Sequence, residues 1–286
     1  MGGVFLNMTF DIQTFILGAV QGLCEFLPIS SSGHLALLQF FFGYGSESEK
    51  FLTFDLLLHC ATILVVLIFF RREIWHLAAQ WFSGCVSAEA RKQEGWVWGW
   101  YILAGTVMTA IIGLPLKKVV EQMMSSPLAV GCGLLATAGL LALVPLLANR
   151  EGRVHSSRTP LKGLKIALIV GLVQGIAVLP GVSRSGSTIA AGLIMGLAVD
   201  EAFRFSFLLS VPAVLGASLL EAVKLFRASG GGLPVGWFWA IAAAFVLGWT
   251  ALKLMHRLVL SGRWAYFGLY CVVLGSIMIL SSLEIF

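Results

Sequence analysis

Long apolar stretches separated by short polar segments run along the whole chain. Six of them reach the roughly 20 residues that a helix needs to cross the hydrocarbon core of a bilayer. They cover residues 53–70, 96–116, 127–148, 205–226, 233–254 and 264–283. The pattern therefore predicts six transmembrane helices.

Two further apolar regions, about 9–43 and 163–200, are each interrupted near the middle by a cluster of Pro, Gly and Ser. Each half holds only about 10 to 18 residues, which is too short to cross a membrane. We therefore predict two re-entrant helical hairpins, whose broken backbone must be surrounded by protein or by a polar cavity. The predicted fold is an all-α polytopic membrane protein, with residues 1–286 as a single membrane domain.

The composition agrees with this prediction and excludes a soluble globular domain. Hydrophobic residues make up 58% of the chain, charged residues only 12%, and the mean hydropathy is +0.93. Such a chain has too little polar surface to cover a water-facing globule. The basic residues lie in short loops and form no basic domain, so membrane lipids are expected around the chain and nucleic acid is not.

The distribution of basic residues predicts the orientation. If each hairpin returns to its own side, the loops after the first, third and fifth spans carry twelve Lys and Arg residues, and the opposite side carries five. Positive residues stay in the cytoplasm, so the twelve-residue side is predicted to be cytoplasmic. Both termini and the first hairpin then face outward, and the second hairpin enters from the cytoplasm.

The two broken regions resemble each other at an offset of 153 residues. Residues 18–22 (GAVQG) align with residues 171–175 (GLVQG), and Ser30, Ser32 and Gly33 align with Ser183, Ser185 and Gly186. Each region is followed by three spans, so we predict two structural repeats, 1–148 and 163–286. Because the number of spans in each repeat is odd, the second repeat is expected to be inverted, with the breaks near the membrane midplane.

The first break carries candidate catalytic residues. Gln21 and Glu25 share one helix face, and an ionised carboxylate at membrane depth requires a cation or a proton. Pro28 ends the first half-helix, and Ser31 and His34 lie in the first turn of the second half-helix. Asp55 and His59, one turn apart in the first span, are either supporting partners of this site or an ordinary interfacial polar pair.

The second break predicts a binding site for an anion. Two half-helix N-termini, with unpaired N–H groups and positive dipole ends, are expected to converge near the pseudo-twofold axis. Arg184 adds a planar fork of donors that matches phosphate oxygens. The remaining candidate phosphate-binding residues are Ser30, Ser32, Gly33, Ser183, Ser185, Gly186 and Thr188.

Residues 21–34 (QGLCEFLPISSSGH) and 180–188 (PGVSRSGST) resemble the two signature stretches of the bacterial undecaprenyl-diphosphatase family, also called bacitracin-resistance proteins. The likeness extends to residues 205–212 and to the layout of the spans. It implies a membrane hydrolase that converts undecaprenyl diphosphate to the monophosphate, recycling the lipid carrier of cell-wall synthesis. It also implies a divalent cation, Mg²⁺ or Ca²⁺, and an active site that opens outward. Gln21 occupies the first position of the family's Glu/Gln-x-x-x-Glu pattern, so only one carboxylate is present at the predicted metal pair of Gln21 and Glu25.

With this chemistry, Ser31 is the candidate nucleophile and His34 the base or leaving-group acid. Glu25 would hold the metal or orient His34, and Arg184 would neutralise the transferred phosphoryl group. An alternative makes His34 the nucleophile. A different function also fits the repeat: a secondary transporter or flippase for an anionic substrate, which needs the anion site but no nucleophile. A homodimer is compatible with either function.

Overall fold

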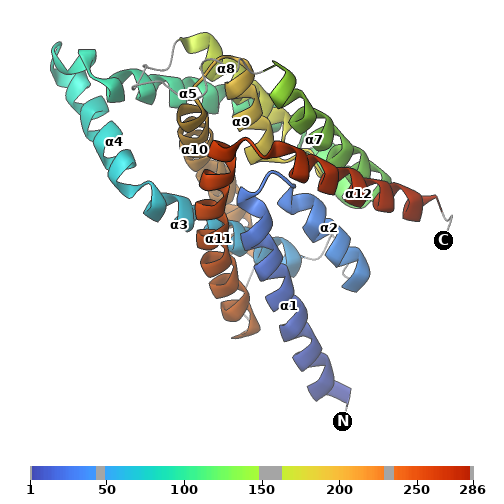
Figure 1. Ribbon diagram of the computed structural model, residues 1–286. Coiled ribbons are helices and arrows are strands. Elements are labelled where there is room, and N and C mark those ends of the chain that lie inside the picture. The colour runs from blue at the N-terminus through green and yellow to red at the C-terminus, as the bar shows by residue number, and fades with distance from the viewer. Residues whose placement is uncertain (1, 43–48, 148–162, 229–234, 284–286) are drawn as a thin grey trace.

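The computed structural model describes residues 2–42, 49–147, 163–228 and 235–283, and every regular element within these ranges is helical (Figure 1). The prediction of an all-α polytopic membrane protein is confirmed. The elements are α1 (Gly2–Phe26), α2 (Ser31–Phe42), α3 (Glu49–Phe69), α4 (Arg71–Val86), η1 (Ala90–Lys92), α5 (Glu94–Gly113), α6 (Lys117–Met124), α7 (Pro127–Leu147), α8 (Leu164–Ile176), α9 (Arg184–Ile194), α10 (Val199–Ala228), α11 (Val235–Ser261) and α12 (Trp264–Ser282).

Four of the six predicted spans are helices long and apolar enough to cross a membrane by themselves. They cover Glu94–Gly113, Pro127–Leu147, Val199–Leu220 and Gly236–Val259 of the described chain. The sixth predicted span corresponds to α12, a shorter apolar helix. Helix α10 begins at Val199, before the predicted 205, so Arg204 lies inside the helix. Its Nε donates to Glu73 across 2.8 Å, and its guanidinium lies 3.7 Å from Glu94.

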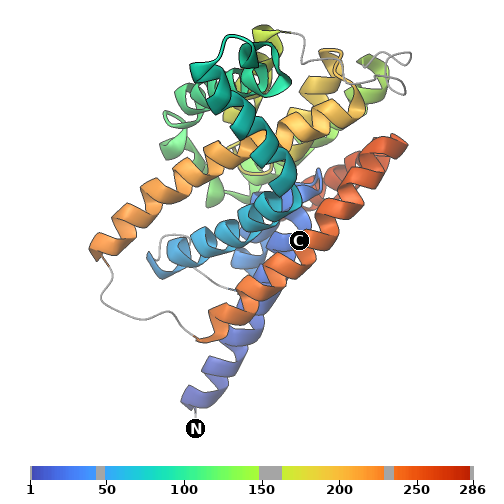
Figure 2. The same cartoon turned by 90° about the vertical axis from the view of Figure 1, so that its left-hand side faces the viewer.

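The first predicted span does not continue as one straight helix. Helix α3 ends at Phe69, and α4 leaves it at an angle of 74°, a bend that Figure 2 shows between the blue and teal segments. Helix α4 begins with Arg71, Arg72 and Glu73, so the chain turns where charged residues would otherwise continue into the apolar layer. It then lies along α5, where the Gln80 side chain accepts a hydrogen bond from the Gly95 amide at 2.7 Å.

Both predicted hairpins are present as pairs of helices joined by short turns, α1 with α2 and α8 with α9. Three of the four helices are short, with 12, 13 and 11 residues in α2, α8 and α9, whereas α1 is longer than predicted, with 25 residues. The turns contain a proline each, Pro28 and Pro180, and a residue in the left-handed region, Ser30 with φ 66° and Gly181 with φ 84°.

Each hairpin packs against a helix from the other half of the chain. Helix α1 lies along α11, and α8 lies along α5. A Cβ atom at Gly18 would overlap the carbonyl oxygen of Ala240, and a Cβ at the aligned Gly171 would overlap the carbonyl oxygen of Gly105. The small residues that repeat in sequence therefore serve the same purpose in both halves, which is close approach between helix backbones.

The turns of the two hairpins meet between them, as Figure 1 shows for the α1–α2 pair below and the α8–α9 pair above. A Cβ atom on Gly33 would lie 3.3 Å from Cα of Gly181, and one on Gly186 would lie 2.9 Å from Cβ of Pro28. Residues 33 and 186, like 28 and 181, are aligned at the 153-residue offset, so the contacts are reciprocal. Such reciprocity is what a twofold-related repeat would produce. The inversion of that repeat across a membrane remains a prediction.

Candidate active site

Glu25, in the last turn of α1, lies at the centre of the polar cluster between the two hairpins. Its Oε1 accepts a hydrogen bond from Nη2 of Arg184 at 2.6 Å. Its Oε2 accepts one from Oγ of Ser31 at 2.7 Å and one from Nε2 of Gln21 at 3.1 Å. The carboxylate side chain is only 9% exposed. A buried carboxylate of this kind is stable only because a cation and several donors satisfy it.

Arg184 is the first residue of α9, and the local sequence fixes its position. Ser183 precedes it as the N-cap residue, and the Ser183 hydroxyl accepts a hydrogen bond from the Gly186 amide at 3.2 Å. The guanidinium uses Nη2 for Glu25, while Nη1 is buried and has no partner among the described residues. The two N–H donors of Nη1 are therefore the part of the guanidinium that can bind an anionic group.

Ser31 begins α2 and is half-buried. Because a carboxylate oxygen only accepts, the short contact to Glu25 must use the Ser31 hydroxyl proton. Ser31 and Arg184 thus bind the two oxygens of one carboxylate, and the predicted meeting of these residues between the hairpins is found. A hydroxyl whose proton points at a carboxylate, beside an unpaired guanidinium donor, has the arrangement of an activated nucleophile next to an anion site.

His34 is buried but directed away from Glu25. Its Nδ1 lies 2.7 Å from the Ser30 carbonyl oxygen, and its Nε2 lies 2.6 Å from the hydroxyl of Tyr270 in α12. Glu25 does not orient His34 in this structure, because its own partners among the described residues are Gln21, Ser31, His59 and Arg184. Tyr270 was not predicted from the sequence, which gives no local sign that α12 reaches His34.

Most of the other predicted phosphate-binding residues use their side chains inside the protein. The Ser30 hydroxyl accepts from the Gly33 amide at 3.3 Å and lies 3.2 Å from the Ser32 hydroxyl. Ser183, Ser185 and Gly186 repeat this arrangement in the second hairpin, with 3.4 Å between the two hydroxyls. The Ser185 hydroxyl also donates to the Leu27 carbonyl at 3.3 Å, which ties one hairpin turn to the other.

Thr188 is likewise committed to internal contacts. Its hydroxyl donates to the Arg184 carbonyl at 2.8 Å and lies 2.5 Å from the hydroxyl of Ser206 in α10. Thr188 and Ser206 are both fully buried. The hydroxyl groups of this helix therefore hold α9 in place, and a direct bond from them to phosphate remains a prediction.

Of the two interpretations of Asp55 and His59, the contacts favour a supporting pair. His59 Nδ1 lies 3.0 Å from the Asp55 carbonyl oxygen and 3.6 Å from the Asp55 carboxylate. Its Nε2 is 3.9 Å from Oε2 of Glu25. The Asp55–His59 spacing was visible in the sequence, whereas the contact with Glu25 depends on how α3 packs against α1.

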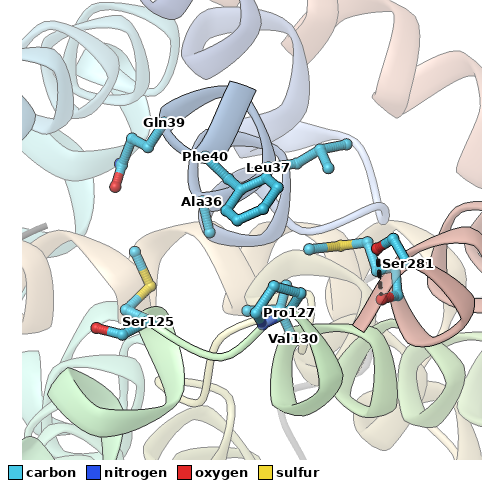
Figure 3. Close-up of a pocket in the computed structure, with 10 residues that line it drawn as sticks. Ala36, Leu37, Gln39, Phe40, Ser125, Pro127, Val130 and Ser281 are labelled. Carbon is cyan, nitrogen blue, oxygen red and sulfur yellow. Dashed lines mark hydrogen bonds between the residues drawn. The ribbon is translucent and has the colours of Figure 1, made fainter. Parts of the chain in front are cut away.

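The polar cluster borders a narrow crevice that has no space wide enough for a water molecule and is lined by Glu25, Phe26, Thr62, Ile63, Val66, Arg184 and Val214. A larger open groove, with a volume of about 210 Å³, lies elsewhere between α2, α7 and α12 (Figure 3). Neither Glu25 nor Arg184 is among the residues that line this groove. Both line the crevice, and Glu25 binds Ser31, so the crevice and the polar cluster beside it are the candidate active site.

The chain matches known proteins over most of its length. The sequence model of the bacitracin resistance protein BacA family matches residues 14–277. The chain belongs to this family. Among curated relatives, an undecaprenyl-diphosphatase of Desulfosudis oleivorans is 45% identical over 93% of this chain and 96% of the relative. An undecaprenyl-diphosphatase of Korarchaeum cryptofilum is 40% identical over 95% of this chain and 98% of its own length. All the residues named for the candidate site lie within the matched range.

Proposed function

We propose that this BacA family member is an undecaprenyl-diphosphatase, a membrane hydrolase that releases inorganic phosphate from undecaprenyl diphosphate. Curated relatives of this name cover nearly the whole chain. The observation that carries the proposal is the shared carboxylate: Glu25 binds the Ser31 hydroxyl at 2.7 Å and the Arg184 guanidinium at 2.6 Å. A carrier needs the arginine but gives no reason for the serine proton to face a buried carboxylate.

In the proposed first step, the Ser31 oxygen attacks the terminal phosphorus of the diphosphate. Glu25 takes the serine proton, and the bond from that phosphorus to the bridging oxygen breaks. Undecaprenyl phosphate leaves with the bridging oxygen, and the phosphoryl group stays on Ser31. Arg184, whose Nη1 has no partner among the described residues, would donate to the transferred group and neutralise its charge.

In the second step, water attacks the phosphorus of the phosphoserine, and the bond from that phosphorus to the Ser31 oxygen breaks. Glu25 returns the proton that it took in the first step to the Ser31 oxygen. The attacking water loses its proton to bulk solvent, and inorganic phosphate is released. In the described structure, His34 forms no hydrogen bond with Ser31 Oγ or with Glu25. Because its ring binds the Ser30 carbonyl, we propose that His34 supports the turn at Ser30 and Ser31. The alternative with His34 as nucleophile has less support, because both ring nitrogens are already engaged.

The residues present can accommodate a divalent cation carried by the substrate. Gln21 is fully buried and its Oε1 has no partner in the described structure, while Glu25 offers carboxylate oxygens. Mg²⁺ is commonly held by one or two protein oxygens together with substrate phosphates and water. Gln21 and Glu25 would be its ligands here, and the ion would neutralise charge on the diphosphate. The described residues contain no group of three or more His, Cys, Asp or Glu side chains that could hold a metal alone.

The membrane orientation proposed for the chain follows from its loop charges. The basic loops lie in the cytoplasm, and both termini and the opening of the site face the outer side of the inner membrane. The polyprenyl chain of the substrate would then stay among lipid-facing helices while its diphosphate enters between the hairpins. A homodimer remains compatible with this arrangement.

The test is release of inorganic phosphate by the purified protein in detergent with undecaprenyl diphosphate, assayed with Mg²⁺, with Ca²⁺ and with a chelator. We expect wild-type protein to release phosphate and Ser31→Ala to release none, although the variant still binds the substrate. Ser261→Ala is the matched control, since Ser261 is exposed at the end of α11. Full activity of Ser31→Ala would exclude the serine mechanism, and no release by wild type under any condition would favour the carrier.

A further inference from the structure

Tyr270, which belongs to neither hairpin, forms a hydrogen bond with His34, a predicted catalytic residue. It lies in α12, and its hydroxyl is 2.6 Å from Nε2 of His34. The two rings are nearly parallel, with an angle of 2° between their planes and 5.5 Å between their centroids. This contact joins residues 236 positions apart in the chain. It is therefore created by the packing of α12.

The partner of the other ring nitrogen of His34 shows which group donates the proton in the Tyr270–His34 hydrogen bond. Nδ1 lies 2.7 Å from the Ser30 carbonyl, which can only accept, so Nδ1 carries the proton. In the neutral imidazole, Nε2 is then an acceptor and the Tyr270 hydroxyl donates to it. The chain of hydrogen bonds runs from Tyr270 through His34 to the carbonyl of Ser30.

The end of this chain is next to the nucleophile. The Ser30 carbonyl belongs to the peptide bond whose nitrogen is that of Ser31. Ser30 itself is the one residue other than glycine with positive φ in the described structure, at 66°. A non-glycine residue in this region is held there by its surroundings. The same carbonyl also accepts from the His34 amide at 3.3 Å, so His34 binds it with both backbone and ring.

We propose that Tyr270 is a positioning residue for the hydrolysis: its hydroxyl fixes the His34 ring on the Ser30 carbonyl and so presents Ser31 to Glu25 and Arg184. This inference rests on the proposed phosphatase function. Tyr270 acts through His34 and touches none of the reacting groups. Substrate binding should then be insensitive to the hydroxyl, while the rate of phosphoryl transfer depends on it.

The variant Tyr270→Phe removes the hydroxyl and keeps the stacked ring. Loss of one hydrogen bond of ordinary strength predicts that kcat falls about threefold to tenfold, with KM changed by less than about twofold. Tyr266→Phe is the matched control, because Tyr266 lies one turn earlier in α12 and is 73% exposed. This control should keep wild-type kcat and KM.

A second measurement separates positioning from a general loss of structure. In protein with isotope-labelled histidine, the nitrogen resonances of His34, assigned with a His34→Gln variant, should show a proton on Nδ1. Tyr270→Phe should shift the Nε2 resonance alone, while the thermal unfolding midpoint stays near the wild-type value. Wild-type kcat in Tyr270→Phe, or an unchanged Nε2 resonance, would overturn the assignment of Tyr270.

The two proposals fail in different ways. If wild-type protein releases phosphate and Ser31→Ala does not, the phosphatase mechanism stands, and a wild-type rate in Tyr270→Phe then refutes the role of Tyr270 alone. If Ser31→Ala keeps full activity, the serine mechanism fails first. A rise in KM with unchanged kcat in Tyr270→Phe would also refute positioning, because it would show contact with the substrate.

Discussion

Arg184 and Glu25 lie 159 residues apart in the sequence, yet Nη2 of the arginine is 2.6 Å from Oε1 of the carboxylate. Each comes from the turn region of a different hairpin. The ion pair thus fixes how the hairpins meet, and both of its members also belong to the proposed chemistry. Because both charges are largely buried, removing either one leaves the other without compensation.

Glu25→Gln should abolish the proposed base while keeping the size of the side chain. Glutamine cannot accept the Ser31 proton, and general-base catalysis contributes about 10² to 10⁴ in rate, so we expect phosphate release to fall by at least about 100-fold. Glu121→Gln is the control, since Glu121 lies on α6 with a side chain 62% exposed. Activity of Glu25→Gln within about tenfold of wild type would exclude Glu25 as the base.

Arg184→Lys keeps the positive charge but loses the second donor. The lysine ammonium can still approach Glu25, whereas the group equivalent to Nη1, which is unpaired in the structure, is missing. We expect kcat for phosphate release to fall about 100- to 1,000-fold, as for loss of one strong donor to the transition state. Arg263→Lys, at an exposed position before α12, should behave as wild type. Equal activities of the two variants would show that the Arg184 guanidinium does not stabilise the transition state.

Gly18→Ala should destabilise the protein through the contact between α1 and α11. Its Cβ would overlap the carbonyl oxygen of Ala240, so the helices must separate. Overpacking of this kind costs about 1–3 kcal/mol, which we expect to appear as a lower thermal unfolding midpoint in detergent. Gly139→Ala is the control, because nothing lies within 4 Å of a Cβ there. Equal midpoints for both variants would contradict the close packing of α1 on α11.

The meeting of Glu25, Ser31 and Arg184 could be predicted from the sequence because its signals are local. A proline in each turn breaks the helix, serines and glycines start the next one, and the repeat pairs the two breaks. The distinction between membrane-spanning helices and shorter half-helices follows from the lengths of the apolar stretches. The predicted start of the first hairpin, near residue 9, is later than the observed start of α1 at Gly2. No proline lies between Gly2 and residue 9, so nothing in the sequence stops the helix from extending toward the N-terminus.

Contacts between distant helices could not be predicted in this way. Tyr270 is one of many aromatic residues in an apolar span, and only the packing of α12 brings it to His34. The bend after Phe69 likewise depends on α4 lying along α5. For His59, the i,i+4 spacing from Asp55 suggested a pair, but its approach to Glu25 at 3.9 Å is a property of the fold.

The predicted orientation can be tested with a cysteine that the chain already has. Cys85 is exposed in α4, which follows the first span and carries Arg71 and Arg72 on the side predicted to be cytoplasmic. In intact cells expressing a variant whose only cysteine is Cys85, a membrane-permeant maleimide should label it and an impermeant sulfonated maleimide should not. A variant with Lys118→Cys as its only cysteine is the control, since Lys118 is exposed on α6 and predicted to face outward, so both reagents should label it. Labelling of Cys85 by the impermeant reagent would reverse the assigned orientation, and with it the side of the membrane from which the diphosphate reaches Glu25 and Arg184.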